Sequence, residues 1–110
     1  MYVYIISSPS TLNRCKVGKH SGTVSDLVSR FITDIPDVCV DYFIKTAHAK
    51  YIEDTFKTSY RQYRFINSRD NLSEWVTLSV EDTFSLLAPI ILKCHGEMVG
   101  NTIMIDWFII

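Results

Sequence analysis

Residues 2–19 read YVYIISSPSTLNRCKVGK and hold two β-prone segments on either side of a polar turn. The first, Tyr2–Ser7, is aromatic and β-branched, and the second, Arg14–Lys19, is also short and contains Gly18. The intervening Ser8–Asn13 is rich in residues that form turns. The pattern therefore predicts an antiparallel hairpin with a long loop.

A helix and a third strand are predicted next. Thr23 and Asp26 have the spacing of a capping box, in which a hydroxyl and a carboxylate satisfy amides that the first helical turn leaves free. Pro36 marks the end of the helix, and Val38–Lys45, which reads VCVDYFIK, has the composition of a buried strand. The apolar residues of the helix recur with the helical period and share one face: Val24, Leu27, Val28, Phe31 and Ile32.

Two further helices and a strand-like segment complete the predicted elements. A second helix is predicted over Ala47–Tyr63, followed by a strand-like segment at Glu74–Leu78. Ser79 and Asp82 repeat the capping-box spacing and open a helix that Pro89 is expected to end or kink. This order predicts an α/β (α+β) domain whose small, three-stranded, mainly antiparallel sheet is flanked by helices.

The composition fits one folded domain. The chain has 110 residues, of which 47% are hydrophobic and 21% charged, which excludes disordered and low-complexity proteins. Three cysteines without CxxC spacing argue against a disulfide framework and a four-thiolate zinc site, and favour a reducing, intracellular compartment. No apolar run has the roughly 20 residues that a membrane span needs, and the N-terminus lacks the pattern of a signal peptide.

The net charge of −1 hides an uneven distribution of charged residues. Residues 55–69 contain four basic residues and no acid. One stripe along the predicted second helix is formed by Glu53, Lys57, Arg61 and Arg64, at positions i, i+4, i+8 and i+11. Two interpretations stay open: a solvated helix face, and a face that follows the phosphates of a nucleic acid.

Four polar side chains fall on successive predicted elements. Tyr4 lies in the first strand, Lys16 in the second, Arg30 on the first helix, and Glu53 near the start of the second helix. Taken singly, each is compatible with an ordinary exposed side chain, and Glu53 with Lys57 is compatible with a surface i, i+4 pair. The information lies in their order along the chain.

In this order the chain resembles the GIY-YIG endonuclease superfamily. The resemblance rests on Y-V-Y at residues 2–4, K-V-G at residues 16–18, Arg30 on the first helix and Glu53 on the second. It is strongest to a branch of phages and large DNA viruses in which the second motif reads K-[IV]-G. The sequence E-W-V at residues 74–76 is similar to a segment that follows the glutamate helix in that branch.

The resemblance implies hydrolysis of a phosphodiester bond in DNA with one bound Mg²⁺ or Mn²⁺. Tyr4 would help to activate the attacking water, and Lys16 would assist either as a donor to the phosphate or as a base. Arg30 would neutralise the scissile phosphate through its bidentate guanidinium. Glu53 would hold the cation, since one carboxylate with waters and phosphate oxygens suits Mg²⁺.

DNA is the expected partner. Two positions depart from the family pattern, with Tyr2 where the superfamily has glycine and Lys57 where the branch has histidine. Trp75 fits either a core position or a platform on which a base stacks. The basic residues expected to contact DNA are Lys19, Lys57, Arg61 and Arg64.

The resemblance covers residues 2–88, so residues 1–92 are predicted to form the nuclease-like domain. Residues 93–110 are a C-terminal extension, either an added strand or the edge of a longer protein. The branch implies a viral or phage protein that acts in the cytoplasm or the host nucleus, with no membrane partner. Two other functions stay open: a non-catalytic module that binds nucleic acid or protein on the same fold, and a structural piece of a larger protein.

Overall fold

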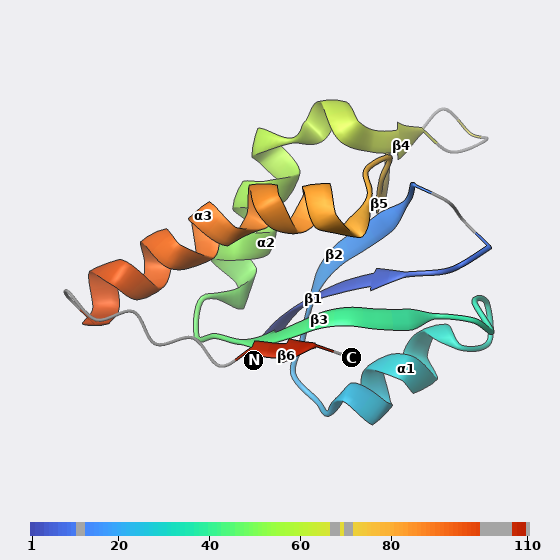
Figure 1. The fold of residues 1–110 in the computed structure, drawn as a ribbon, viewed down its shortest axis with the longest axis horizontal. Coiled ribbons are helices and arrows are strands. Elements are labelled where there is room, and N and C mark those ends of the chain that lie inside the picture. The colour runs from blue at the N-terminus through green and yellow to red at the C-terminus, as the bar shows by residue number, and fades with distance from the viewer. Residues whose placement is uncertain (11–12, 67–68, 70–71, 100–106, 110) are drawn as a thin grey trace.

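The computed structural model describes residues 1–10, 13–66, 69, 72–99 and 107–109. Strands and helices combine in an α+β arrangement (Figure 1). In chain order the elements are β1 (Tyr2–Ser7), β2 (Cys15–His20), α1 (Val24–Phe31), β3 (Cys39–Lys45), α2 (Ala49–Ser59), the 3-10 turn η1 (Arg61–Tyr63), β4 (Arg64–Ile66), β5 (Leu72–Val76), α3 (Val80–Val99) and β6 (Trp107–Ile109).

The described strands form one antiparallel sheet in the order β4-β5-β2-β1-β3-β6. The predicted centre is confirmed, because β1 lies between β2 and β3. The predicted number of three strands is wrong, because the sheet is wider. β5 pairs with β2, β4 pairs with β5, and β6 pairs with β3. An edge strand leaves backbone amides and carbonyls unpaired, and these additions satisfy part of both edges of the central three strands. The α+β class is thus confirmed, with a wider sheet.

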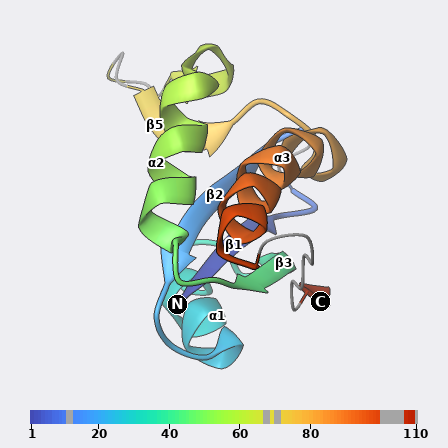
Figure 2. The same ribbon diagram turned by 90° about the vertical axis from the view of Figure 1, so that its left-hand side faces the viewer.

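The two faces of the sheet pack against different helices, because side chains alternate along each strand. On one face, Ile5 belongs to a buried cluster with Ile52 of α2 and Leu87 of α3. On the other face, Tyr4 belongs to a smaller cluster with Leu27 of α1. Figure 2 shows α2 and α3 on one side of the sheet and α1 on the other. Helices therefore cover both faces of the sheet.

The start of α1 is as predicted. The Thr23 hydroxyl accepts a hydrogen bond from the Asp26 amide, and the Asp26 carboxylate accepts one from the Thr23 amide, both at 3.2 Å. Such a cap stabilises a helix by about 1 kcal/mol. With the first turn fixed, Leu27 is buried and Arg30 lies in the last turn.

The predicted second helix is wrong at both ends. α2 begins at Ala49 and ends at Ser59, and the chain continues as η1 and β4. The last two residues of α2, Thr58 and Ser59, have low helix propensity. Beyond them, the Thr77 amide donates to the Tyr63 carbonyl at 2.7 Å. This hydrogen bond joins the segment after α2 to the end of β5, so the segment does not continue as a helix.

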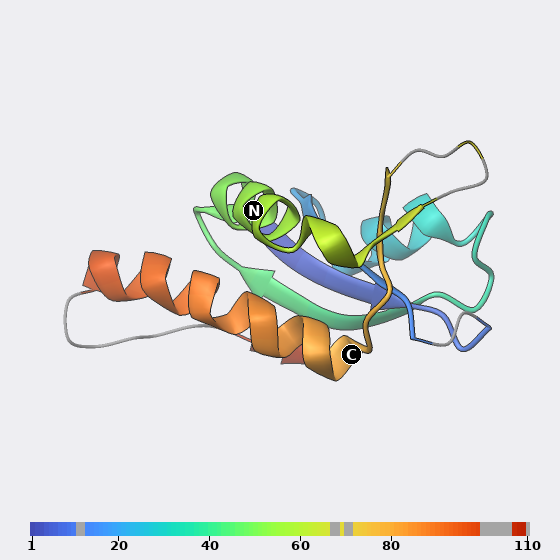
Figure 3. The ribbon, with the colours of Figure 1, turned by 90° about the horizontal axis from the view of Figure 1, so that it is seen from above.

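α3 runs through Pro89 as one helix (Figure 3), so of the two outcomes predicted for this proline, an end or a kink, the end is wrong. Leu87 and Ile91 lie on either side of Pro89 and are both fully buried. Their packing offsets the backbone hydrogen bond that proline removes. Neither α3 nor any other helix in the described ranges is long and apolar enough to cross a membrane.

The segment predicted as a C-terminal extension, residues 93–110, begins inside α3. No element boundary therefore separates it from residues 1–92. Its residues 107–109 form β6 beside β3. Residues 100–106 and 110 lie outside the part of the chain that the structure describes.

Candidate active site

The register of β1 and β2 places Tyr4 beside Gly18. A Cβ atom at Gly18 would lie 2.8 Å from Cε2 of Tyr4 and closer still to its Cζ and hydroxyl. Glycine therefore lets the Tyr4 ring lie across β2, so that its hydroxyl reaches the edge of that strand. The ring is almost fully buried, and it packs edge-on against Phe31 with ring centroids 6.2 Å apart.

The Tyr4 hydroxyl lies in an environment that disfavours its ionisation. Burial raises the pKa of Tyr4 to about 12. The positive charge of Arg30 opposes this rise in pKa, and the carboxylates of Glu53 and Glu74 add to it. The phenol is therefore protonated at neutral pH and can donate a hydrogen bond.

Lys16 lies on β2 opposite Trp75 of β5. Its ammonium forms an ion pair with the Glu74 carboxylate at 2.6 Å and lies 4.9 Å from the centre of the Phe31 ring. The Lys16 side chain is only 11% exposed. The carboxylate and the ring face therefore replace much of the water that the ammonium loses on burial.

Glu53 of α2 approaches the same edge of β2 from the other side of the sheet. Lys57, one turn further along α2, donates to Glu53 at 3.1 Å and to Glu74 at 3.2 Å. With the pair between Lys16 and Glu74, these contacts form a continuous chain of four alternating charges. The pKa of Glu74 is lowered to about 2, and the hydrogen bond from Lys16 is the main cause. Lys57 lowers this pKa further, whereas burial raises it.

Arg30 reaches this cluster from the last turn of α1. It is exposed, and its guanidinium carbon lies 5.3 Å from the centre of the Phe31 ring. Within the described part of the chain, Arg30 forms no ion pair. Its N–H donors are therefore available to an incoming anion.

These side chains line one pocket of about 190 Å³, which we call the charged pocket. β5 pairs with Cys15 and Lys16, and the pocket opens on the edge of β2 just beyond that pairing. All four residues predicted to carry the chemistry take part, although they come from β1, β2, α1 and α2. The lining residues are Tyr4, Lys16, Gly18, Lys19, Arg30, Glu53, Lys57 and Glu74.

The predicted basic stripe along the second helix is wrong beyond Lys57. α2 ends before Arg61, so Arg61 lies in η1 and Arg64 begins β4. The Arg64 Nε donates to a backbone carbonyl of β5 at 2.9 Å and helps to join β4 to β5. Of the four residues expected to contact DNA, Lys19 and Lys57 line the charged pocket, and Arg61 and Arg64 do not.

Glu74 is the residue of the charged pocket that sequence reasoning missed. Its segment supports the family resemblance, but no local spacing places it near Lys16. The usable signal is strand pairing. Once β5 joins β2 with Trp75 opposite Lys16, the neighbouring Glu74 comes within reach of the Lys16 ammonium.

The charged pocket offers two carboxylates to a cation. In the described ranges, no group of three or more His, Cys, Asp or Glu side chains converges as a metal site. Glu53 and Glu74 both contact Lys57, so two carboxylates lie at the pocket. A site with few protein carboxylates and several waters suits Mg²⁺ or Mn²⁺. Glu53 is the residue of this pair that the resemblance assigns to the metal.

As the resemblance predicts, the chain has relatives among viral proteins. It is 43% identical over 72 residues to an uncharacterized protein of Acanthamoeba polyphaga mimivirus, in a match that covers 66% of this chain and 19% of that protein. It is 37% identical over 91 residues to a second uncharacterized protein of the same virus, covering 83% and 23%. The chain thus spans about a fifth of the length of these relatives. No family model and no solved structure matches the chain.

Proposed function

We propose that this chain is a metal-dependent DNA endonuclease of the GIY-YIG type that hydrolyses phosphodiester bonds with Mg²⁺ or Mn²⁺. The observation that carries the proposal is the convergence of Tyr4, Lys16, Arg30 and Glu53 on one pocket of about 190 Å³. These residues lie on four different elements. Their meeting is therefore a result of the fold and not of closeness in the sequence.

The charge of the pocket suits a phosphodiester. Four cationic side chains line it against two carboxylates, which leaves two formal positive charges. Lys16 and Tyr4 are buried, so part of the lining is recessed below the protein surface. A recess lined by one prevailing sign of charge attracts the opposite charge more strongly than an open surface does.

The side chains have complementary tasks in hydrolysis. Arg30 binds non-bridging phosphate oxygens through its guanidinium fork and neutralises the charge that grows in the transition state. Tyr4, whose raised pKa of about 12 keeps it protonated, orients the attacking water by hydrogen bonding. Lys16, held by Glu74 at 2.6 Å, acts as a donor to the phosphate rather than as a base.

Glu53 is the proposed protein ligand of the metal. When bound, the cation would polarise a phosphate oxygen and stabilise the leaving 3′-oxygen. The Lys57 ammonium lies 3.1 Å from Oε1 of Glu53 and orients this carboxylate at the pocket. The Glu53 side chain is 13% exposed, so its position is fixed by the surrounding protein more than by solvent.

One observation favours a second function, a non-catalytic module that binds nucleic acid. Both carboxylates of the charged pocket are paired with Lys57. This lysine also stands where the resembling branch has histidine. In such a module the cations of the pocket would bind phosphates, and the carboxylates would only balance their charge.

Cleavage of supercoiled plasmid by the wild type and by Glu53→Gln separates these two functions. With Mg²⁺ or Mn²⁺ the wild type should nick the plasmid, and a chelator should stop it. Glu53→Gln should lower the rate by about 10²-fold or more, because the amide keeps the side-chain volume but loses the charge that attracts the cation.

Asp54→Asn is the matched control for this experiment. Asp54 is the next acid on α2, and it pairs with Lys50 at 2.8 Å outside the charged pocket. The control should cleave as the wild type does. If the wild type nicks no plasmid with either cation but still binds it, the nuclease is contradicted and the binding module takes its place.

A further inference from the structure

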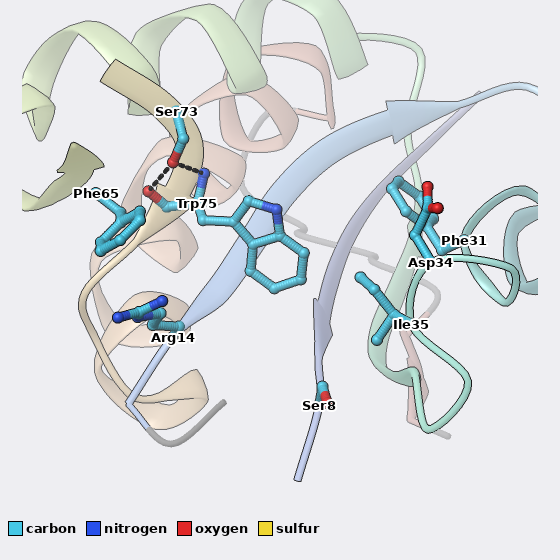
Figure 4. A pocket seen from close by; sticks show the side chains of 8 residues that line it. All are labelled: Ser8, Arg14, Phe31, Asp34, Ile35, Phe65, Ser73 and Trp75. Carbon is cyan, nitrogen blue, oxygen red and sulfur yellow. Dashed lines mark hydrogen bonds between the residues drawn. The ribbon is translucent and has the colours of Figure 1, made fainter. Parts of the chain in front are cut away.

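The structure has a second pocket, of about 480 Å³ (Figure 4). We call it the aromatic pocket, because rings from α1, β4 and β5 line it. The lining residues are Ser8, Arg14, Phe31, Asp34, Ile35, Phe65, Ser73 and Trp75.

Two walls face each other across the aromatic pocket. Figure 4 shows the Trp75 indole projecting between them, with Arg14 and Phe65 on one side and Phe31 with Asp34 on the other. The guanidinium carbon of Arg14 lies 3.9 Å from the centre of the Phe65 ring. The pocket therefore combines flat apolar faces with a cation and a carboxylate.

The Phe31 ring joins the two pockets. Lys16 and Arg30, which line the charged pocket, place their cations 4.9 Å and 5.3 Å from the centre of this ring. The same ring lines the aromatic pocket, and so does Trp75, which lies opposite Lys16 in the pairing of β2 with β5. A phosphate held by Lys16 and Arg30 would thus lie one side chain away from the aromatic pocket.

We propose that the aromatic pocket binds an unpaired base of the DNA strand whose phosphate occupies the charged pocket. This inference rests on the proposed function, because it places the phosphate at Lys16 and Arg30. A base inside a duplex presents only its edges to a protein, whereas an unpaired base presents its faces to aromatic side chains. A volume of about 480 Å³ lies within the range of roughly 300–1,000 Å³ that is typical of small-ligand sites.

The polar side chains of the aromatic pocket match the edge of a base. Arg14 supplies hydrogen-bond donors for a ring nitrogen or carbonyl oxygen, and Asp34 supplies acceptors for an exocyclic amino group. Both side chains are exposed, so they are accessible from the mouth of the pocket. The protein should therefore prefer DNA in which a base beside the bound phosphate is already unpaired, since no base pair then has to be broken.

Binding of two fluorescent duplexes in the presence of a chelator tests this inference without cleavage. One duplex is fully paired, and the other carries a single-base bulge. Wild type should bind the bulged duplex about 5- to 150-fold more tightly, the factor that corresponds to stacking one base on aromatic side chains. Trp75→Ala should remove most of this preference, and Trp75→Phe should keep it.

Two further variants distinguish loss of the aromatic pocket from loss of folding. Trp75 also packs against the cluster beneath α1, so Phe65→Ala, on the short β4, is the second variant of the aromatic pocket. It too should reduce the preference for the bulged duplex. Arg30→Ala is the control in the charged pocket, and it should weaken binding of both duplexes by the same factor.

A crosslinking measurement locates the base directly. A photoreactive 5-iodouracil at the bulge should crosslink to Trp75 or Phe65, as mapped by mass spectrometry. Equal binding of the two duplexes by the wild type, or crosslinks confined to other residues, would overturn the inference even if the plasmid is cleaved. A preference for bulged DNA without any cleavage would support the aromatic pocket and contradict the nuclease alone.

Discussion

The charged pocket and the aromatic pocket meet at Phe31 but are built in different ways. The charged pocket brings six charged side chains together around about 190 Å³, and its ion pairs join β2, α2 and β5. The aromatic pocket is larger, about 480 Å³, and part of its lining comes from the segment after α1 and from the short β4. The contrast teaches that the charged pocket is held by ion pairs between regular elements, whereas the aromatic pocket is lined in part by a loop and a short strand.

The largest expected effect comes from breaking the charged pocket at Gly18, which is not part of the aromatic pocket. Gly18→Ala places a Cβ against the Tyr4 ring, so either the ring or the strand must move. We expect the free energy of unfolding to fall by about 1–3 kcal/mol and plasmid cleavage to be lost. The preference for bulged DNA should fall less than cleavage does, because the displaced Tyr4 ring packs edge-on against one ring of the aromatic pocket, that of Phe31. Urea unfolding and the duplex-binding assay measure these outcomes.

The same substitution in a Tyr4→Leu background tests the cause of that effect. The shorter leucine ends before the atoms that a Cβ at Gly18 would approach. Gly18→Ala should therefore destabilise this background much less than the wild type, and a double-mutant cycle gives the difference as a coupling energy. Equal destabilisation in both backgrounds would show that the contact with Tyr4 is not the reason.

An intermediate effect is expected on the salt dependence of DNA binding. Lys19 lines the charged pocket, whereas Arg61 lies outside it in η1. Lys19→Ala should reduce the slope of log K against log salt by about 0.9, the value for one lost phosphate contact. Arg61→Ala should leave the slope unchanged. A similar reduction by both variants would instead support a basic track that continues beyond α2.

The sequence predicts best those features that depend on local composition and short motifs. The aromatic and β-branched composition of Tyr2–Ser7 and the capping box at Thr23 and Asp26 give β1 and the start of α1 closely. Each depends on residues a few positions apart, so no distant partner is needed to read them. Tyr4, Lys16, Arg30 and Glu53 could be singled out because a family resemblance gave their order meaning, and the fold then brought them to one pocket.

Features that depend on long-range pairing are not visible in the sequence. Glu74 enters the charged pocket because β5 pairs with β2, a contact between segments far apart in the chain. Helical spacing aligned Arg61 and Arg64 with Lys57, but the pairing of β4 with β5 ends that helix earlier. The aromatic pocket depends on the same pairing, because β4 and β5 carry two of its three rings.

The smallest expected effect concerns the ion pairs of Glu74 in the charged pocket. Among the described residues, the lining of the aromatic pocket forms no such ion pair. In the folded protein the hydrogen bond from Lys16 lowers the pKa of Glu74 from its ordinary value of 4.5 to about 2. Between these two values the unfolded state binds more protons than the folded state. Glu74 therefore adds to stability above pH 4.5, and this contribution is lost as the pH falls through about 2.

Glu74→Gln should remove this contribution and with it part of the acid sensitivity of the fold. Because the Glu74 side chain is 52% exposed, each of its pairs with Lys16 and Lys57 is expected to stabilise the protein by only about 0.2–1 kcal/mol at neutral pH. Urea unfolding at several pH values should show the difference between wild type and variant shrinking as the pH approaches 2. In a Lys16→Met background the difference should already be small at neutral pH, because the main cause of the low pKa is gone. A difference that stays constant with pH would mean that Glu74 stabilises the fold through packing. The geometry of the charged pocket would then depend on side-chain packing rather than on its ion pairs.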